Sequence, residues 1–441
     1  MKINVRRQLV AAACIFCGLF SYAQTGVGSY GSYSPYTVYG VGDLSRGGTS
    51  FNQSMGGVGV ATRNKRYINI MNPAAVTARD SLSFMVDFGL SGTNNVYYQN
   101  NLKSANNTFT MVNFVMSFPI WKSSAMMIGI CPFSGVGYDF THIEQNPDII
   151  GQIGNITHQY YGQGTLNNLF ISAGATFFKR VSVGAEMDFI FGTLNEYSNV
   201  IFAAADHRPL TGGYTSVIRG FTGKFGLQYE QPIGGKSSIT VGATYRLASK
   251  INGEYTQYRF ATASEIVDSV KINQGKIQDG NLRFGDELGV GINYRMGDKL
   301  SVEINYLRGN WSKTGMDSNE GFMVKTGEGK YFHGAVMNSL RAGVEFVPAR
   351  NDVRYYFRKC AYRAGLYYES SYYTFDGYGV NQRGITLGMT FPIFKWYNGI
   401  SVGVDVGSRG TVRNDMVREI FTTISVGFNI HDYWFHKHQY L

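Results

Sequence analysis

Few residues in the chain have the types and spacing that chemistry requires. Three histidines stand close together near its end, in His431-Asp432 and His436-Lys437-His438, where imidazole and carboxylate groups could bind a metal ion. An exposed amphipathic tail is the alternative reading, and we favour it. The remaining histidines are isolated in predicted loops: His142, His158, His207 and His333. HExxH, CxxC and Walker sequences are absent, so we expect no catalytic residues, no metal and no cofactor, and an outer-membrane enzyme is the least favoured class.

A glycine-rich stretch at residues 55–61 contains Gly56, Gly57 and Gly59, which could be read as a phosphate-binding loop. No βαβ unit surrounds it, so we reject that reading. It belongs to residues 24–80, which do not alternate cleanly and also hold Asn72-Pro73-Ala74. A segment this short is too small for a stable core of its own, but it could fold back inside a larger structure.

Composition limits the classes of protein that need consideration. The chain has 441 residues, 55 of them glycine, with 44% hydrophobic, 15% aromatic and 16% charged residues. The hydrophobic content excludes disorder, and the glycine and aromatic content is typical of a β protein with many turns. After residue 20 no apolar run approaches the length of a membrane helix. The net charge of +10 is spread among turns, so we expect no nucleic-acid partner.

The first 23 residues are predicted to be a signal peptide. Lys2, Arg6 and Arg7 precede an apolar run at residues 9–20, and a small-residue cleavage site ends at Ala23. A short N-terminal anchor is the alternative. Export leaves Cys131 and Cys360, which are too few and too distant for a disulfide scaffold, although a single bridge between them stays an alternative.

Strict alternation of apolar and small or polar residues dominates the chain after residue 80, as at residues 400–406 and 385–393. One apolar and one polar face per strand fits either a soluble sandwich or propeller, or a membrane barrel with its apolar face toward lipid. Charges of both signs on the polar face, long segments such as 181–203 and 239–261, and aromatics at segment ends favour the barrel.

We therefore predict an all-β fold: a 14-stranded antiparallel transmembrane β-barrel with an N-terminal lumenal hatch. Tight turns and long loops alternate, which places the turns in the periplasm and the odd-numbered strands running outward. The expected division is residues 24–80 as hatch, 81–435 as barrel and 436–441 as periplasmic tail, in the outer membrane of a Gram-negative type of cell. The predicted strands lie near residues 82–98, 107–120, 125–142, 158–178, 181–203, 214–231, 239–261, 280–296, 300–314, 334–347, 360–375, 378–394, 400–409 and 416–430.

The glycine stretch, Asn72-Pro73-Ala74 and a first strand at Leu82 together resemble the FadL/TodX family of outer-membrane transport proteins. The resemblance implies an N-terminal hatch that carries the Asn-Pro-Ala motif and passage of hydrophobic molecules, fatty-acid-like or aromatic. It also implies a kinked third strand that opens sideways into the bilayer. Residues 130–138 are the candidate kink, because Pro132 cannot donate to the ladder and glycines permit a bulge; an ordinary rim bulge is the alternative. The kink residues are Pro132, Phe133, Ser134, Gly135 and Gly137.

Diffusive transport of a hydrophobic small molecule through the hatch-gated barrel, with membrane lipid at the exit, is the leading interpretation. The alternative is a FadL-like barrel that acts as a protein-binding platform or shuttle subunit of a secretion or assembly complex, with a periplasmic or outer-membrane protein partner. We expect Asn72-Pro73-Ala74 to contact the wall near the third strand. The lumen-lining ligand candidates, some of which could simply pack against the hatch, are Met127, Phe133, Phe170, Phe178, Ile190 and Tyr367.

Charge divides between the two predicted rims. The periplasmic turns and tail hold eleven basic and three acidic residues, whereas the outer loops hold seven basic and eleven acidic residues. A solvated rim with a sorting bias would account for this. The alternative is contact with anionic lipid headgroups or an acidic partner, densest at Arg350, Arg354, Arg358 and Lys359.

Overall fold

The computed structural model describes residues 31–79, 83–203, 208–263, 266–277, 282–317, 325–326, 329–330, 332–375, 377–393, 398–413 and 416–433. The predicted signal peptide, the first residues of the predicted hatch and the predicted C-terminal tail therefore lie outside the described residues. No helix among the described residues is long and apolar enough to cross a membrane.

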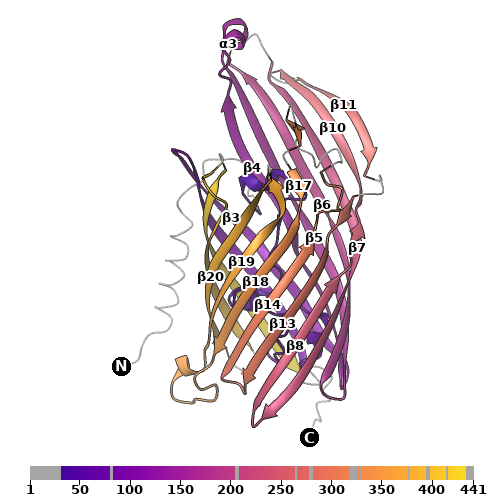
Figure 1. The fold of residues 1–441 in the computed structure, drawn as a ribbon, viewed down its shortest axis with the longest axis vertical. Helices are drawn as coiled ribbons and strands as arrows, with labels where there is room; N and C mark the ends of the chain where they lie inside the picture. The colour runs from indigo at the N-terminus through magenta and orange to yellow at the C-terminus, as the bar shows by residue number, and fades with distance from the viewer. Residues whose placement is uncertain are drawn as a thin grey trace.

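Fourteen antiparallel strands form a closed barrel, which confirms the predicted fold, and the first strand closes the ring by pairing with the last (Figure 1). They are β2 (Ser83–Gln99), β3 (Leu102–Trp121), β4 (Ser124–Ile143), β5 (Ile156–Phe177), β6 (Val181–Phe202), β7 (Leu210–Gly234), β8 (Ser237–Arg246), β13 (Asp286–Met296), β14 (Leu300–Asn310), β18 (Val336–Phe346), β19 (Ala361–Phe375), β20 (Tyr378–Pro392), β21 (Gly399–Arg409) and β22 (Arg418–Tyr433).

The period-2 pattern sets which side chains face the lumen. In β21, Ser401 is 4% exposed, whereas Val404 and Val406 on the opposite face are 38% and 49% exposed. The buried lumen face carries charges such as Glu303 and Arg341, and the outer face is apolar. This is the reverse of a soluble sandwich and is the arrangement that a lipid-facing barrel requires.

The predicted seventh strand, residues 239–261, is wrong in its second half. β8 ends at Arg246, and the chain continues through β9 (Ser249–Lys250), which pairs with β12 (Arg283–Phe284). β10 (Asn252–Ala263) and β11 (Ile266–Lys276) then form a hairpin on the upper part of β7, where a loop was expected at 262–279. The alternation continues past Arg246 in the sequence. In the structure, however, Ile251 and Phe284 pack in the apolar cluster of the lumen, so the chain leaves the ring of strands here.

One wall is much taller than the other. β5, β6 and β7 have 22, 22 and 25 residues, whereas β8, β13, β14 and β18 have 10 or 11. We call the end with the tight turns the turn end and the opposite end the loop end. The tall wall rises at the loop end with the β10–β11 hairpin and α3 (Pro147–Ile153) (Figure 1). The remaining short elements are β15 (Lys325–Thr326), β16 (Gly329–Lys330), β17 (Phe332–Gly334) and η3 (Tyr356–Arg358).

Residues 31–79, which we call the inner segment, pack inside this ring (Figure 1). They contain η1 (Pro35–Val38), β1 (Asp43–Leu44), α2 (Ser50–Gln53) and η2 (Pro73–Thr77). Ser34 and Asn72 cap the two 3₁₀ helices, each followed by a proline at the first helical position. The sequence thus starts and stops very short helices, which lets the segment follow the inside of the wall.

Candidate functional site: the inner segment and the β3–β4 seam

The ladder between β3 and β4 is incomplete. It runs from the Trp121–Ser124 pair to the Phe114–Ile130 pair and is not continued beyond that by any described pair. From there toward the loop end, β4 pairs with β5 and β3 pairs with β2. We call this unpaired stretch the seam. It starts after Ile130, just before Pro132, which has no N–H for the ladder. The register between β4 and β5 shifts at the same place, between Pro132 and Ser134.

The residue displaced by that shift is Phe133. Its ring turns inward, is 8% exposed and meets the Phe284 ring edge-on with centroids 5.2 Å apart. The guanidinium of Arg246 lies 5.5 Å from its centroid. The predicted kink residues therefore mark a bulge at the start of the seam, and the lateral exit assigned to them stays a proposal.

The inner segment covers part of the seam from within. β1 pairs with β4 through Asp43–Gly135 and Leu44–Ser134. The backbone N–H of Ser34 donates to the oxygen of Gly137 at 2.8 Å, and Ser45 N–H donates to Phe133 at 2.9 Å. β1 therefore pairs with two residues of β4 in the stretch where β3 does not pair with β4.

A cavity of about 220 Å³ lies directly behind the seam. Its wall is mixed: Thr108 and Thr110 come from β3, Cys131 and Pro132 from β4, Arg46 from the inner segment and Asp405 from β21. Arg46 Nη2 lies 2.5 Å from Asp405 Oδ2, and its guanidinium stacks 4.0 Å above the Tyr367 ring. The Tyr367 hydroxyl donates to the same carboxylate at 3.1 Å. The cavity therefore has a charged end as well as apolar walls.

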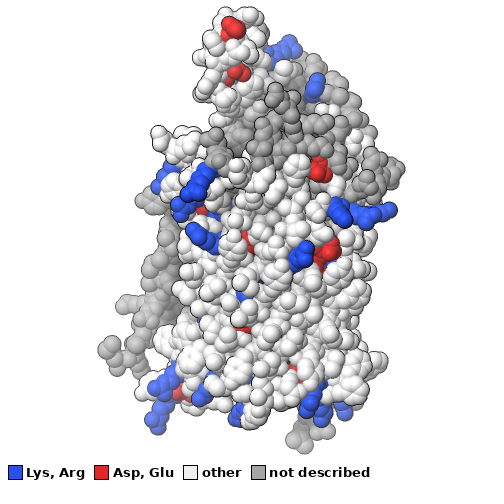
Figure 2. Space-filling model, viewed as in Figure 1, with Lys and Arg blue, Asp and Glu red and all other residues white. Residues whose placement is uncertain are grey.

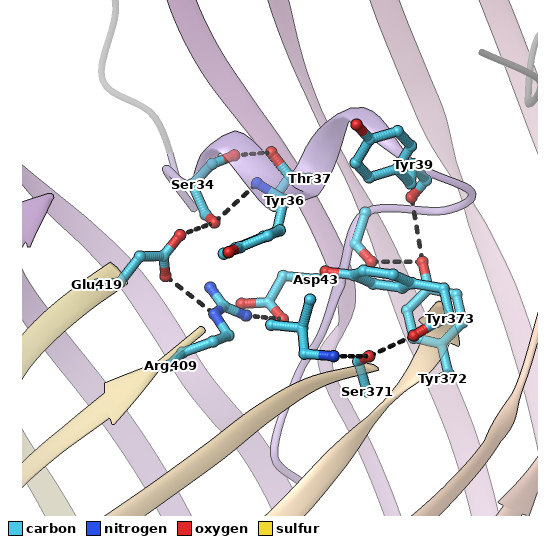
Figure 3. Close-up of polar contacts among 12 residues, drawn as sticks. Ser34, Tyr36, Thr37, Tyr39, Asp43, Ser371, Tyr372, Tyr373, Arg409 and Glu419 are labelled. Atoms are coloured by element: carbon cyan, nitrogen blue, oxygen red, sulfur yellow. Dashed lines mark hydrogen bonds and ion pairs between the residues drawn. The ribbon is translucent and has the colours of Figure 1, made fainter. Parts of the chain in front are cut away.

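A second ion-pair cluster fastens η1 and β1 to the wall (Figure 3). Arg409 of β21 contacts Asp43 at 2.7 Å and Glu419 at 2.9 Å, and its side chain is 11% exposed. The Ser34 hydroxyl donates to the other oxygen of Glu419. Nearby, the Tyr372 hydroxyl donates to the oxygens of Gly42 at 2.6 Å and Tyr39 at 3.2 Å.

The predicted glycine motif forms close contacts between the inner segment and the wall. Gly56 and Gly57 both have φ +74°, a conformation that side chains rarely adopt. A methyl group on Gly56 would lie 2.6 Å from the backbone oxygen of Ala342. The Arg341 guanidinium donates to the oxygen of Gly57 at 3.1 Å. A methyl group on Gly59 would lie 2.6 Å from Asn52 Nδ2, so this position too requires glycine.

Asn72-Pro73-Ala74 does not sit where we expected. The motif packs on β6 and β7, where Gly184 and Gly226 have room only for hydrogen beneath it. The Asn72 amide donates to Val60 at 2.7 Å within the inner segment. Contact with β4, the third barrel strand, comes from Val76 instead. Wall positions without a side chain, rather than the kink, thus decide where the motif docks.

Five of the six predicted lumen residues point inward. Met127 and Phe170 pack with Ile68, Ile70 and Val76 of the inner segment. Phe133 and Ile190 belong to the larger apolar cluster toward the loop end, and Tyr367 contacts Arg46 and Asp405. Contact with the inner segment was the alternative role for such residues, and it applies directly to Met127 and Phe170.

Phe178 is a wrong prediction. It lies in the β5–β6 turn with φ +52° and is 92% exposed. The strand ends at Phe177, so the alternation that seemed to place Phe178 inside does not extend to it.

Several polar residues of the site were missed by sequence reasoning. Asp43 and Arg46 lie in a stretch without alternation, and Glu419 was not singled out. Glu303 was recognised as lumen-facing but not as a ligand of the inner segment, where it accepts from Ala61 N–H at 2.9 Å and from the Thr62 hydroxyl. The available signal was a charge at a lumen-facing strand position, which needs a partner once the lumen is filled.

Charge is distributed as expected at the turn end. Figure 2 shows a broad belt with few charged side chains, and Lys and Arg gathered below it. The predicted basic cluster is divided, however. Arg350 turns toward the lumen and donates to the oxygen of Asp298 at 3.4 Å, whereas Arg358 is exposed and pairs with Asp352 at 3.3 Å. Arg354 is exposed and Lys359 is half-buried. Cys131 and Cys360 are both free thiols.

Known structures share this fold. The channel CymD for monoaromatic hydrocarbons matches with a TM-score of 0.58 and 14% identity, over 88% of this chain and 99% of that one. The Pseudomonas putida toluene transporter TodX matches with a TM-score of 0.58 and 13% identity, over 90% of this chain and 100% of that one. The Ralstonia pickettii toluene transporter TbuX matches with a TM-score of 0.56 and 16% identity, over 87% of this chain and 98% of that one. No curated protein matches the sequence.

The fold and its filled lumen define a FadL-type β-barrel, as the resemblance implied. The sequence itself shows a more particular family: the BamG family model matches residues 5–441, and the chain belongs to that family.

Proposed function

We propose that this protein is an outer-membrane barrel that passes amphipathic small molecules of the fatty-acid type through the β3–β4 seam. The observation that carries the proposal is the cavity directly behind a stretch of wall whose strands are not paired to each other. The known barrels with this fold include hydrocarbon channels and toluene transporters, which supports passage of molecules with an apolar part.

The lining of the cavity favours an amphipathic molecule over a bare hydrocarbon. A carboxylate head group would share the Arg46 guanidinium with Asp405 and would find hydroxyls at Thr108 and Thr110. A hydrocarbon would instead bury these polar groups without compensation. Beside the seam, the exposed rings of Phe109 and Phe140 offer an apolar surface to the tail.

In this proposal β1 is the latch. Its ladder with β4 has only two residue pairs, and each hydrogen bond contributes about 1 kcal/mol net. These contacts can therefore open while the Asp43–Arg409 ion pair and the remaining inner segment stay bound. Ion pairs elsewhere, such as Arg63 with Glu230 at 3.3 Å, hold the segment in place.

A disulfide lock tests the latch. Leu44 and Ser134 are register partners, so Leu44→Cys with Ser134→Cys, in a chain with Cys131→Ser and Cys360→Ser, brings two thiols within bonding reach. The readout is uptake of a fluorescent dodecanoic acid into proteoliposomes. We expect oxidation to reduce uptake to the rate of protein-free vesicles and reduction to restore it.

The matched control is Leu387→Cys with Val404→Cys in the same background. These residues are register partners on the outer face of β20 and β21, which are paired along their length. Oxidation there should leave uptake unchanged. Uptake that persists through the oxidised Leu44–Ser134 lock would refute passage at the seam.

A binding platform is the second candidate, because the tall wall exceeds what a membrane crossing needs. A tilted crossing takes ~9–11 residues, whereas β7 has 25 and continues sideways into the β10–β11 hairpin. Replacing residues 256–274 by a short turn should leave the barrel closed, because β8 pairs directly with β13. If the platform reading holds, this replacement abolishes stoichiometric co-purification of a protein partner, while the oxidised seam lock does not.

A further inference from the structure

A second cavity, of about 260 Å³, lies at the turn end between the inner segment and the wall. We call it the basic cavity. Its rim includes the exposed residues Lys65 and Asp298, so it faces solvent at that end of the barrel. It is separate from the cavity behind the seam, and none of its lining residues belongs to the seam. Five basic side chains line it: Arg63, Lys65, Arg66, Arg295 and Arg350.

Acidic groups do not balance these charges. Glu230 is shared by Arg63 and Arg295, at 3.3 and 3.4 Å. Asp298 pairs with Arg66 at 3.1 Å. The remaining carboxylate of the lining, Glu345, is bound by Arg363 at 2.8 Å. Two carboxylates, Glu230 and Asp298, thus face the four guanidiniums of the lining, which leaves an excess of positive charge in a hollow that opens to solvent at the turn end.

Arg350 shows the imbalance most directly. One end of its guanidinium contacts a backbone oxygen, and its buried Nε has no hydrogen-bond partner among the described residues. Burial and the neighbouring Arg66 lower the pKa of Arg350, and the opposing effects of Glu345, Tyr67 and Asp298 do not offset them. The carboxyl of Asp298 behaves in the opposite way: burial acts to raise its pKa, but Arg66 and other guanidiniums hold it below the usual value.

We infer that the basic cavity is a binding site for a phosphate group, held by the guanidiniums of Arg66, Arg295 and Arg350 with Lys65 at the rim. Several guanidiniums converging on one hollow favour a multivalent oxyanion, because each offers a fork of N–H donors to its oxygens. A phosphate would offset the excess charge of these guanidiniums. The group could be carried by free phosphate or by a lipid headgroup, since both present the same oxygens.

Titration calorimetry of the purified full-length protein in a zwitterionic detergent tests the site, first with inorganic phosphate and then with glycerol 3-phosphate. Retention of phosphatidylglycerol, measured by native mass spectrometry, tests the lipid source. We expect binding that Arg350→Met weakens by about tenfold or more and that Arg350→Lys weakens less, because the ammonium keeps the charge without the fork. Arg354→Met, on the same loop but outside the cavity, should leave it unchanged.

Binding of the soluble phosphates identifies free phosphate as a sufficient ligand, and retention of phosphatidylglycerol alone identifies a headgroup. Heat-modified migration in gel electrophoresis checks that each variant is folded. If Arg350→Met does not fold, Lys65→Met at the exposed rim takes its place and should weaken binding about threefold. The inference fails if none of the three probes binds above chloride controls, or if Arg354→Met weakens binding as much as the cavity variants.

Discussion

At the scale of single residues, buried charges join the inner segment to the wall. Arg409 contacts Asp43 on the inner segment and Glu419 on β22, and the side chains of Arg409 and Glu419 are 11% and 1% exposed. Removing the cation would leave two carboxylates with no counter-charge. The cost of breaking a buried pair in this way is about 3–5 kcal/mol.

We therefore predict that Arg409→Met loosens η1 and β1 without opening the barrel. Hydrogen exchange of the amides in residues 34–45 should become at least about a hundredfold faster, which corresponds to about 3 kcal/mol. Exchange in β13 and β14 should not change. The control is Arg418→Met, since Arg418 is exposed on the neighbouring strand. Equal exchange in both variants would mean that the cluster does not hold the segment.

At the scale of elements, glycines on the wall decide where η2 docks. The helix lies on β5, β6 and β7. The side chains of Asn72 and Pro73 lie so close to Gly226 that a methyl group there would be 2.1 Å from Asn72 Oδ1. Three residues earlier in β7, Gly223 has its nearest neighbour 3.6 Å from where a methyl group would lie. Gly226 faces the lumen and Gly223 the outer side of the same strand, so Gly223 serves as a control that does not touch η2.

Gly226→Ala should displace η2 and destabilise the folded protein by about 1–3 kcal/mol, the usual range for overpacking. Gly223→Ala should have an effect below about 0.5 kcal/mol. The measurement is the urea midpoint of unfolding, followed by gel migration. The docking described above would be contradicted by two variants of equal stability.

At the scale of the whole molecule, the two ends differ in length, charge and loop structure. The turn end carries basic turns and the 347–360 loop, which exposes Val353 and Phe357 at 88% and 65%. The loop end carries the tall wall and α3 (Figure 1). In outer-membrane barrels short turns face the periplasm, so these ends should lie on opposite sides of the membrane.

An epitope tag inserted within α3 should therefore be labelled by antibody on intact cells. The same tag between residues 351 and 352 should be labelled only after the outer membrane is permeabilised. Both insertions fall in exposed segments, so both proteins should fold. Labelling of the second tag on intact cells would reverse the orientation and move the basic cavity to the cell surface.

The sequence alone determined the barrel, its strand number and the side of each strand that faces lipid. These follow from a period of two residues, which is a local property. The alternation can be recognised in β21 or β13 alone, from the sequence of that strand. The bulge at Pro132 was predictable for the same reason, because the missing N–H belongs to one residue. Where local alternation ran past the true end of a strand, as at Phe178 and beyond Arg246, the prediction was wrong.

Only the tertiary structure decided what fills the lumen and which charges meet there. Arg409 and Asp43 are 366 residues apart in the chain, and Arg46 and Asp405 are 359 apart. Such pairs form because the pairing of β2 with β22 closes the barrel, so the lumen faces of all strands surround one space. The shape of the inner segment in that space then decides which side chains it contacts. The alternation in the sequence does not indicate which strands close the barrel. The seam cavity and the basic cavity therefore became visible only in the folded barrel.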